Sequence, residues 1–332
     1  MKASTFEPRT IPHFPPWKRY LSYLPLYGIA VPLTRVLGLA GKWPHAMARQ
    51  AWRSMGGFGD YRATASDVFV CSYIKSGTTW MLQLAIQVTH RGEAEFDNIL
   101  YAVPWPDGIT RQQPYIVPLE DPSPTECSPT GLRVIKTHLP YSSVPRNPDS
   151  RYIAVVRDPK DVCVSAYFFF RANVWGPLAP TIANWIDFYT SEDFVFGAWA
   201  NHVASYWAQR EAPNVLFLTF EEIKGDLAGI VRRVAEFTGV RLSEEQTARV
   251  LGRCSFDYMK RNQSRFDPLQ TVPWAVREGS MVRSGRRGGS AELLSKAQRR
   301  QLDAHFRAEL RRLDCDFPYD DVFDTERSGD PT

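Results

Sequence analysis

The segment Asp67–Trp80, DVFVCSYIKSGTTW, decides the fold class of this chain. Asp67–Tyr73 is rich in β-branched and aromatic residues, which is typical of a short buried strand. The next residues, Ser76–Thr79 (SGTT), are turn and helix-capping types, and Trp80–His90 is apolar at helical spacing. A strand, a short loop and a helix in this order predict one unit of a parallel α/β sheet.

The rest of the chain repeats this order. Further strands are predicted at Arg133–Thr137, Arg151–Val156 and Val215–Thr219. Helices are predicted at residues 160–171, 227–238, 243–251 and 295–313. Alternating strands and helices predict a single α/β domain with a parallel β-sheet flanked by helices, whose ligands bind at the carboxyl ends of the strands. We expect this domain to span residues 61–325, after an N-terminal arm formed by residues 1–60.

Composition narrows the class of protein. Of the 332 residues, 44% are hydrophobic and 13% are aromatic, which is enough for a sizeable core. The net charge of +4 suits an anionic ligand in a local pocket and falls far short of a nucleic-acid-binding surface. The five cysteines have no CxxC spacing, which argues against a zinc site and a disulfide framework. That pattern favours a reducing, cytoplasmic compartment.

The N-terminal arm begins without the apolar core of a secretory signal. Its most apolar stretch, Leu21–Gly41, is interrupted by Pro25, Pro32 and Arg35, and its apolar runs are too short to span a bilayer. Three interpretations stay open. The arm packs on the domain, touches a membrane surface through residues 21–41, or forms a wall of an apolar acceptor pocket.

The loop after the first strand, Lys75–Thr79 (KSGTT), has the residues of an anion cradle. Glycine lets the backbone approach an anion, the helix start supplies unpaired N–H groups, and lysine and hydroxyl side chains add donors. The G-x-x-x-x-G-K-[ST] spacing of a Walker loop is absent. Taken alone, the loop fits a phosphate site and an ordinary capped turn equally well.

Tyr73–Trp80 (YIKSGTTW) resembles the 5′-phosphosulfate loop, Y-P-K-S-G-T-T-W, of the sulfotransferases that use 3′-phosphoadenosine 5′-phosphosulfate (PAPS). The resemblance implies a P-loop-like nucleotide-binding fold, with Ile74 in place of the family's proline. It implies that Lys75 contacts the bridging oxygen and the sulfate and that Trp80 stacks on the adenine. The 5′-phosphate would be held by Ser76, Gly77, Thr78 and Thr79.

A second motif follows the strand Arg151–Val156. Arg157-Asp158-Pro159-Lys160-Asp161, with Ser165 after it, resembles the family's 3′-phosphate site, R-[DN]-P-K-D-x-x-x-S. Arginine offers a two-pronged fork to a phosphate, and a helix hydroxyl can reach the same group. The resemblance implies that Arg157 and Ser165 bind the 3′-phosphate.

A third motif, Lys136–Pro140 (KTHLP), resembles the family's catalytic segment. It implies that His138 is the general base that takes the proton of the acceptor hydroxyl, and that Lys136 stabilises charge on the sulfuryl group. His202, in Gly197–Trp207, also follows a family pattern, and there we expect helical packing instead.

Weaker similarities complete the predicted donor site. Met281–Gly289 (MVRSGRRGG) resembles the glycine-rich closing motif R-K-G-x-x-G-x-W, with Ser284 at the lysine position and Ser290 at the tryptophan position. Phe220 stands where many members have a tyrosine beside the adenine. By resemblance, the further donor-binding residues are Phe220, Ser255, Phe256, Met281, Arg283, Ser284 and Gly285.

These motifs together predict a PAPS-dependent sulfotransferase (EC 2.8.2 type) that needs no metal and releases 3′,5′-adenosine bisphosphate (PAP). The expected acceptor is a hydroxylated, apolar small molecule or lipid, because aromatic residues such as Trp105 and Phe168–Phe170 accompany the motifs. No nucleic-acid partner is expected, and a homodimer stays open. Two alternatives remain, a P-loop-type nucleotide kinase and a non-catalytic PAP-binding protein.

Overall fold

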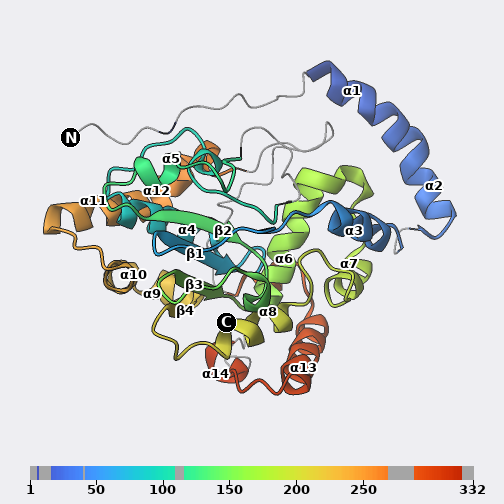
Figure 1. The fold of residues 1–332 in the computed structure, drawn as a ribbon. Coiled ribbons are helices and arrows are strands. Elements are labelled where there is room, and N and C mark those ends of the chain that lie inside the picture. The colour runs from blue at the N-terminus through green and yellow to red at the C-terminus, as the bar shows by residue number, and fades with distance from the viewer. Residues whose placement is uncertain (1–5, 7–15, 40–41, 109–115, 268–287, 324–332) are drawn as a thin grey trace.

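The computed structural model describes residues 6, 16–39, 42–108, 116–267 and 288–323, arranged around one parallel sheet (Figure 1). The strands are β1 (Asp67–Ser72), β2 (Arg133–Thr137), β3 (Arg151–Val156) and β4 (Val215–Thr219). Their spatial order is β2-β1-β3-β4, and every neighbouring pair is parallel. The predicted fold class, an α/β domain with a parallel sheet flanked by helices, is confirmed.

Helices surround this sheet. The α-helices are α1 (Pro16–Pro25), α2 (Val31–Val36), α3 (Trp43–Ser54), α4 (Thr78–Thr89), α5 (Ser123–Glu126), α6 (Pro159–Phe170), α7 (Ile182–Tyr189), α8 (Trp199–Trp207), α9 (Phe220–Gly225), α10 (Leu227–Thr238), α11 (Glu244–Cys254), α12 (Phe256–Arg261), α13 (Lys296–Arg312) and α14 (Tyr319–Phe323). Two π-helical turns, η1 (Leu26–Ala30) and η5 (Arg171–Trp175), follow α1 and α6.

β1 and β2 are buried along their whole length, as strands covered on both faces require, and β4 is partly exposed. Alternate residues of β1 point to opposite sides. Val68 and Val70 join the core beneath α4 and α10, while Phe69 and Cys71 pack on the side of Tyr206 from α8. A third cluster, rich in aromatic rings, joins α6, α7, α8, α13 and α14.

Local capping signals explain why the predicted helices begin close to where they were expected. Ser243 and Ser295 each form a reciprocal capping box at the starts of α11 and α13. The side chain of Asp158 accepts the backbone N–H of Lys160, and Pro159 occupies the first helical position of α6. The strands at 133–137, 151–156 and 215–219 and the helix at 227–238 have the predicted bounds.

The N-terminal arm contains helices that the sequence patterns did not predict. Residues 16–36 form one helical run, α1, η1 and α2, and α3 follows it. The prolines concealed this run because Pro25 and Pro32 interrupt the usual helical signals. Pro25 lies at the junction with the π turn and has helical backbone angles, φ −67° and ψ −29°.

Candidate active site

The carboxyl ends of β1, β2, β3 and β4 all point to one edge of the sheet, because the strands are parallel. The loop Tyr73–Gly77 leaves β1, His138 leaves β2, Arg157 leaves β3 and Phe220 leaves β4. Sequence motifs far apart in the chain therefore meet at this edge, where open α/β sheets bind ligands.

The loop after β1 turns sharply into α4. The Ser76 N–H donates to the Tyr73 carbonyl at 3.1 Å, and Lys75 has a left-handed backbone, φ 64°. Such a conformation is uncommon for a residue with a side chain and often occurs at functional sites. Gly77 begins α4 without a side-chain cap, so the first N–H groups of the helix are available to an anion.

Phe220 fixes this turn from the side of β4. A β-carbon at Gly77 would lie 2.6 Å from Cδ2 of Phe220, and Gly77 has φ 97°. Only glycine satisfies both the backbone angle and the contact. The Phe220 ring also meets Trp80 edge-on, with centroids 5.7 Å apart. Phe220, which stands where many family members have a tyrosine beside the adenine, therefore supports the phosphate loop directly.

Arg157 links the first two motifs. Its Nη1 donates to the Lys75 carbonyl at 3.3 Å, its Nη2 pairs with Asp161 at 3.3 Å, and its guanidinium lies 4.4 Å from the Phe220 ring centroid. Arg157 Nε and Ser76 Oγ are among the buried polar atoms that have no hydrogen-bond partner in the described residues. Buried donors of this kind are expected where a polar ligand supplies the missing bonds.

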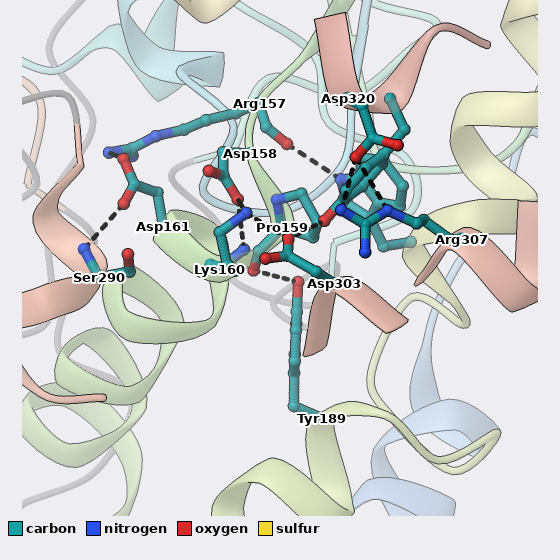
Figure 2. A network of polar contacts seen from close by, with 12 residues as sticks. Arg157, Asp158, Pro159, Lys160, Asp161, Tyr189, Ser290, Asp303, Arg307 and Asp320 are labelled. Carbon is teal, nitrogen blue, oxygen red and sulfur yellow. Dashed lines mark hydrogen bonds and ion pairs between the residues drawn. The ribbon is translucent and has the colours of Figure 1, made fainter. Parts of the chain in front are cut away.

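A buried polar network extends from Arg157 toward the C-terminal helices (Figure 2). The Asp161 carboxylate accepts the Ser290 N–H at 2.9 Å, directly after the glycine-rich segment that was predicted to close over the donor. Lys160 pairs with Asp158 at 3.1 Å and with Asp303 of α13. The Arg157 motif is thus attached both to the phosphate loop and to the elements that follow residue 287.

The residues predicted for the adenine lie beside the first turn of α4. Trp80 Nε1 donates to the Cys254 carbonyl at 2.8 Å, which ties α4 to the segment containing Ser255 and Phe256. The Ser255 hydroxyl caps α12 by accepting the Tyr258 N–H at 3.2 Å. Phe256 is 37% exposed, so its ring is accessible for stacking.

His138 is buried next to the phosphate loop. Its Nδ1 lies 2.7 Å from the Ser72 carbonyl oxygen, and its backbone N–H donates to Asp107 at 2.7 Å. The rings of Trp105 and Phe196 meet it edge-on at 5.6 and 4.7 Å. Burial, reinforced by the charge of nearby Lys136, holds the pKa of His138 well below its usual range.

Lys136 is also buried. Its Nζ lies 3.3 Å from the ring centroid of Trp105. Burial lowers the pKa of Lys136 to about 7; the carboxylate of Asp107 opposes this shift, and the charge of Lys75 adds to it. Burial raises the pKa of Asp107 to about 6, although its hydrogen bond from the His138 backbone N–H opposes the rise.

Each cation of the site therefore lies on an aromatic face. The pairs are Lys136 on Trp105, Arg157 on Phe220, and Lys75 on Phe169, the last at 4.5 Å. Such contacts stabilise a positive charge without neutralising it. The edge of the sheet remains electropositive and suited to a polyanionic ligand.

Comparisons with known proteins identify the family. Residues 65–314 match the family model described as "Sulfotransferase domain". This chain belongs to the sulfotransferase family. The predicted class, a PAPS-dependent sulfotransferase, is confirmed with it, and the nucleotide kinase alternative is not favoured.

Two relatives illustrate the likeness. Luciferin sulfotransferase from Photinus pyralis is 32% identical over 252 residues, which cover 66% of this chain and 65% of that protein. Sulfotransferase 1B1 from Mus musculus is 28% identical over 269 residues, which cover 78% of this chain and 87% of that protein.

Solved structures share the sulfotransferase fold. Retinol dehydratase, in a complex with androsterone and the inactive cofactor PAP, aligns with a TM-score of 0.64 and 24% identity, covering 81% of this chain and 88% of that one. Mouse sulfotransferase SULT7A1 in complex with PAP aligns with a TM-score of 0.57 and 24% identity. The alignment covers 76% of this chain and 87% of that one.

The structure brings most of the predicted sulfotransferase residues together. Lys75, Lys136 and His138 lie close enough for their charges to influence one another, and Arg157 and Phe220 contact the phosphate loop. The Thr78 hydroxyl lies 2.6 Å from that of Ser72. Ser165 lies in the second turn of α6, partly exposed. Four predicted residues fall outside the described residues, namely Met281, Arg283, Ser284 and Gly285.

The sequence did not reveal several neighbours of the site. Asp107 belongs to the proline-rich stretch after residue 100, which carries no periodic signal. Phe196 packs on His138 with a left-handed backbone, φ 73°. The following Gly197 accepts the Tyr73 hydroxyl at its carbonyl, at 2.6 Å. Among the described residues, no three His, Cys, Asp or Glu side chains gather as metal ligands would.

We predict that Gly77→Ala lowers the free energy of unfolding by about 2–5 kcal/mol. A left-handed backbone costs a residue with a side chain roughly 1–2 kcal/mol, and overpacking against Phe220 adds about 1–3 kcal/mol. Gly131→Ala is the matched control because Gly131 also has a positive φ, 68°, with nothing within 4 Å of the added carbon. Urea denaturation measures both variants, and equal losses would contradict the role of Phe220.

We predict that Asp303→Asn lowers the free energy of unfolding by about 2–3 kcal/mol. The loss is below the usual cost of breaking a buried ion pair because Asp158 still faces Lys160. Asp320→Asn is the control, since its pair with Arg307 is partly exposed and contributes less than about 1 kcal/mol. If the two substitutions cost the same in chemical denaturation, the buried network does not stabilise the fold.

Proposed function

We propose that this sulfotransferase moves the sulfuryl group of PAPS to a hydroxyl of an apolar small-molecule acceptor, with His138 as the general base. The observation that carries the proposal is the hydrogen bond between His138 Nδ1 and the Ser72 carbonyl. A carbonyl oxygen can only accept, so Nδ1 carries the proton. In the neutral ring Nε2 then holds the free lone pair that a base requires.

Burial favours the same assignment. Because it depresses the pKa of His138, the imidazole is neutral at pH 7 and ready to accept a proton. The negative charges of a bound donor raise that pKa toward the working pH, where proton transfer is most efficient. His202 is also buried, and burial lowers its pKa to about 3. It packs between the rings of Tyr73 and Tyr206, which supports a packing role.

The donor is held along the edge of the sheet. The α4 N-terminus, with Ser76, Gly77, Thr78 and Thr79, binds the 5′-phosphate. Arg157 and Ser165 bind the 3′-phosphate, and the adenine lies by Trp80, Phe220, Ser255 and Phe256. Ser76 Oγ and Arg157 Nε, which have no partner among the described residues, support this placement.

Lys75 and Lys136 stabilise the charge that develops during transfer. Sulfuryl transfer parallels phosphoryl transfer, in which positioning and charge stabilisation supply most of the rate enhancement. A lysine aimed at the departing phosphate oxygen stabilises the transition state more than the ground state. The low local dielectric around Lys136 strengthens this effect.

The acceptor class follows from the surroundings of His138. Trp105 and Phe196 border it, and Phe169 lies under Lys75. Aromatic walls with few polar groups favour an apolar acceptor that presents one hydroxyl. The name of the relative from Photinus pyralis, which refers to luciferin, supports a small molecule. Not all of the aromatic residues near the motifs form part of the proposed acceptor site. Phe170 and Trp175 stack on each other in the core, with ring centroids 5.1 Å apart.

We also infer a cytoplasmic location and a catalytic domain over residues 61–325. The described residues form no disulfide bond, and Cys71, Cys163 and Cys254 are buried in the core as thiols. Cysteines that form no disulfide fit a reducing compartment.

We predict that His138→Ala lowers the turnover number with PAPS and a phenol or steroid acceptor by about 10²–10⁴-fold, the usual contribution of a general base. PAP binding measured by calorimetry should change little. His305→Ala, which removes a partly buried histidine on α13, is the control and should retain turnover. Near-normal turnover of His138→Ala would reject the assignment. PAP binding by the unsubstituted protein without turnover on any acceptor would favour a non-catalytic PAP-binding protein.

We predict that kcat/KM for PAPS falls as the pH rises above about 7. The pKa of Lys136 in the free enzyme is lowered to about 7, so the charged form needed at the sulfuryl group is lost on the alkaline side. The pKa of His138 lies well below 6.5, so its loss of base function appears only at lower pH. In Lys136→Arg the guanidinium stays charged, and the alkaline fall should move upward. If kcat/KM fell at the same pH in Lys136→Arg, the fall would have to be assigned to another group.

A further inference from the structure

The N-terminal helices expose most of the large apolar side chains on the described surface. All but one of these exposed side chains lie between Trp17 and Met47, and the exception is Phe256. Leu24 is 76% exposed and Val36 is 82% exposed. A contiguous apolar surface of this kind marks an interaction site more often than a scatter of single residues does.

Six of the exposed side chains recur along the helical run 16–36 at steps of three to five residues, and we call them the apolar stripe. Its members are Trp17, Leu21, Leu24, Ile29, Leu33 and Val36, and Tyr27, Leu37 and Leu39 are further exposed apolar side chains of the same arm. Steps of three and four residues keep side chains on one face of an α-helix. The step of five, from Leu24 to Ile29, crosses the π turn, where the Val31 N–H donates to the Leu26 carbonyl. A π turn contains an extra residue, so the stripe continues along one face.

The opposite side of the arm is attached to the domain. Leu26 is buried, and the π turn lies against the turn Gly176–Leu178. Trp43 of α3 meets Trp175 edge-on at 5.2 Å, and Arg49 pairs with Asp193 at 2.8 Å. α1 and α2 extend along the outside of the molecule, beyond α3 and α6 (Figure 1). The arm is therefore held with its apolar stripe uncovered.

The charged residues of the same segment are all basic. Residues 8–59 contain no Asp or Glu, although the whole chain has 36 acidic residues and a net charge of only +4. The basic residues of this segment are Arg9, Lys18, Arg19, Arg35, Lys42, Arg49 and Arg53. Lys18 and Lys42 are exposed at the start of α1 and just before α3. An apolar stripe within a segment that carries only positive charge is complementary to an anionic lipid surface.

We propose that residues 16–39 dock this sulfotransferase on the surface of an anionic lipid bilayer. The apolar stripe enters the boundary between headgroups and acyl chains, and the helical run lies in the plane of the membrane. Trp17, at one end of the stripe, is the type of residue that prefers this boundary. No helix among the described residues is long and apolar enough to cross a bilayer. The proposal does not depend on the identity of the acceptor or on the role of His138.

The test uses the full-length protein and flotation with lipid vesicles. Vesicles of phosphatidylcholine are compared with vesicles of an equal mixture of phosphatidylcholine and phosphatidylglycerol, at low and high salt. The variant Leu21→Glu/Leu24→Glu places two acidic groups in the apolar stripe. The control Ala248→Glu/Ala304→Glu adds the same charge at exposed positions of α11 and α13.

We expect the unsubstituted protein to float with the anionic vesicles and less with the neutral ones, and salt to weaken its binding. Leu21→Glu/Leu24→Glu should lower the bound fraction at least about tenfold, because two leucines no longer enter the membrane. The control should bind like the unsubstituted protein. Thermal stabilisation by PAP should be the same in all three proteins, which shows that each is folded.

Three results would overturn the proposal. The first is equal binding of the stripe variant and the control. The second is an absence of vesicle binding together with a dimer that Leu21→Glu/Leu24→Glu dissociates in light scattering, which would assign the stripe to a second copy of this chain. The third is an absence of vesicle binding with a raised KM for a soluble acceptor in the stripe variant, which would make the arm a wall of the acceptor pocket.

Discussion

Positive charge gathered at the carboxyl edge of the sheet is the constraint on which the site depends. Lys136, Arg157 and Lys75 approach one another there because three parallel strands end side by side. Buried cations are costly unless something stabilises them. Trp105, Phe220 and Phe169 do so through their ring faces, and Asp107 and Asp161 supply nearby carboxylates. The arrangement suits a polyanionic donor.

The same constraint explains why the site is stiff. Phe220 lies against the guanidinium of Arg157 and also fills the space beside Gly77. The phosphate loop is therefore packed against the end of β4. Asp161 joins these elements to Ser290, and Lys160 joins them to Asp303 on α13 (Figure 2). A site whose cations are held from several sides is pre-organised, so little reorganisation is needed when charge develops in the transition state.

Sequence patterns were sufficient to predict the features of the fold and the site that depend on neighbouring residues in the chain. Buried strands read as apolar runs, capping boxes mark the starts of α11 and α13, and the family's motifs stand at the strand ends. The patterns failed where the signal is not local. Pro25 concealed the continuity of α1 with the π turn, and the proline-rich stretch gave no reason to expect Asp107 beside His138. A side chain brought in by an irregular loop leaves no periodicity in the sequence.

By itself, the sequence determined the fold class, the family and the residue types at the site, because these depend on local periodicity and on short motifs. Only the tertiary structure decided the tautomer of His138 and the depressed pKa values of Lys136 and His138, because burial and neighbours distant in the chain set them. It also decided that the Tyr73–Trp80 loop is braced by Phe220, and that the apolar residues of the arm form one uncovered stripe. Both depend on how helices and strands pack, which short motifs do not encode.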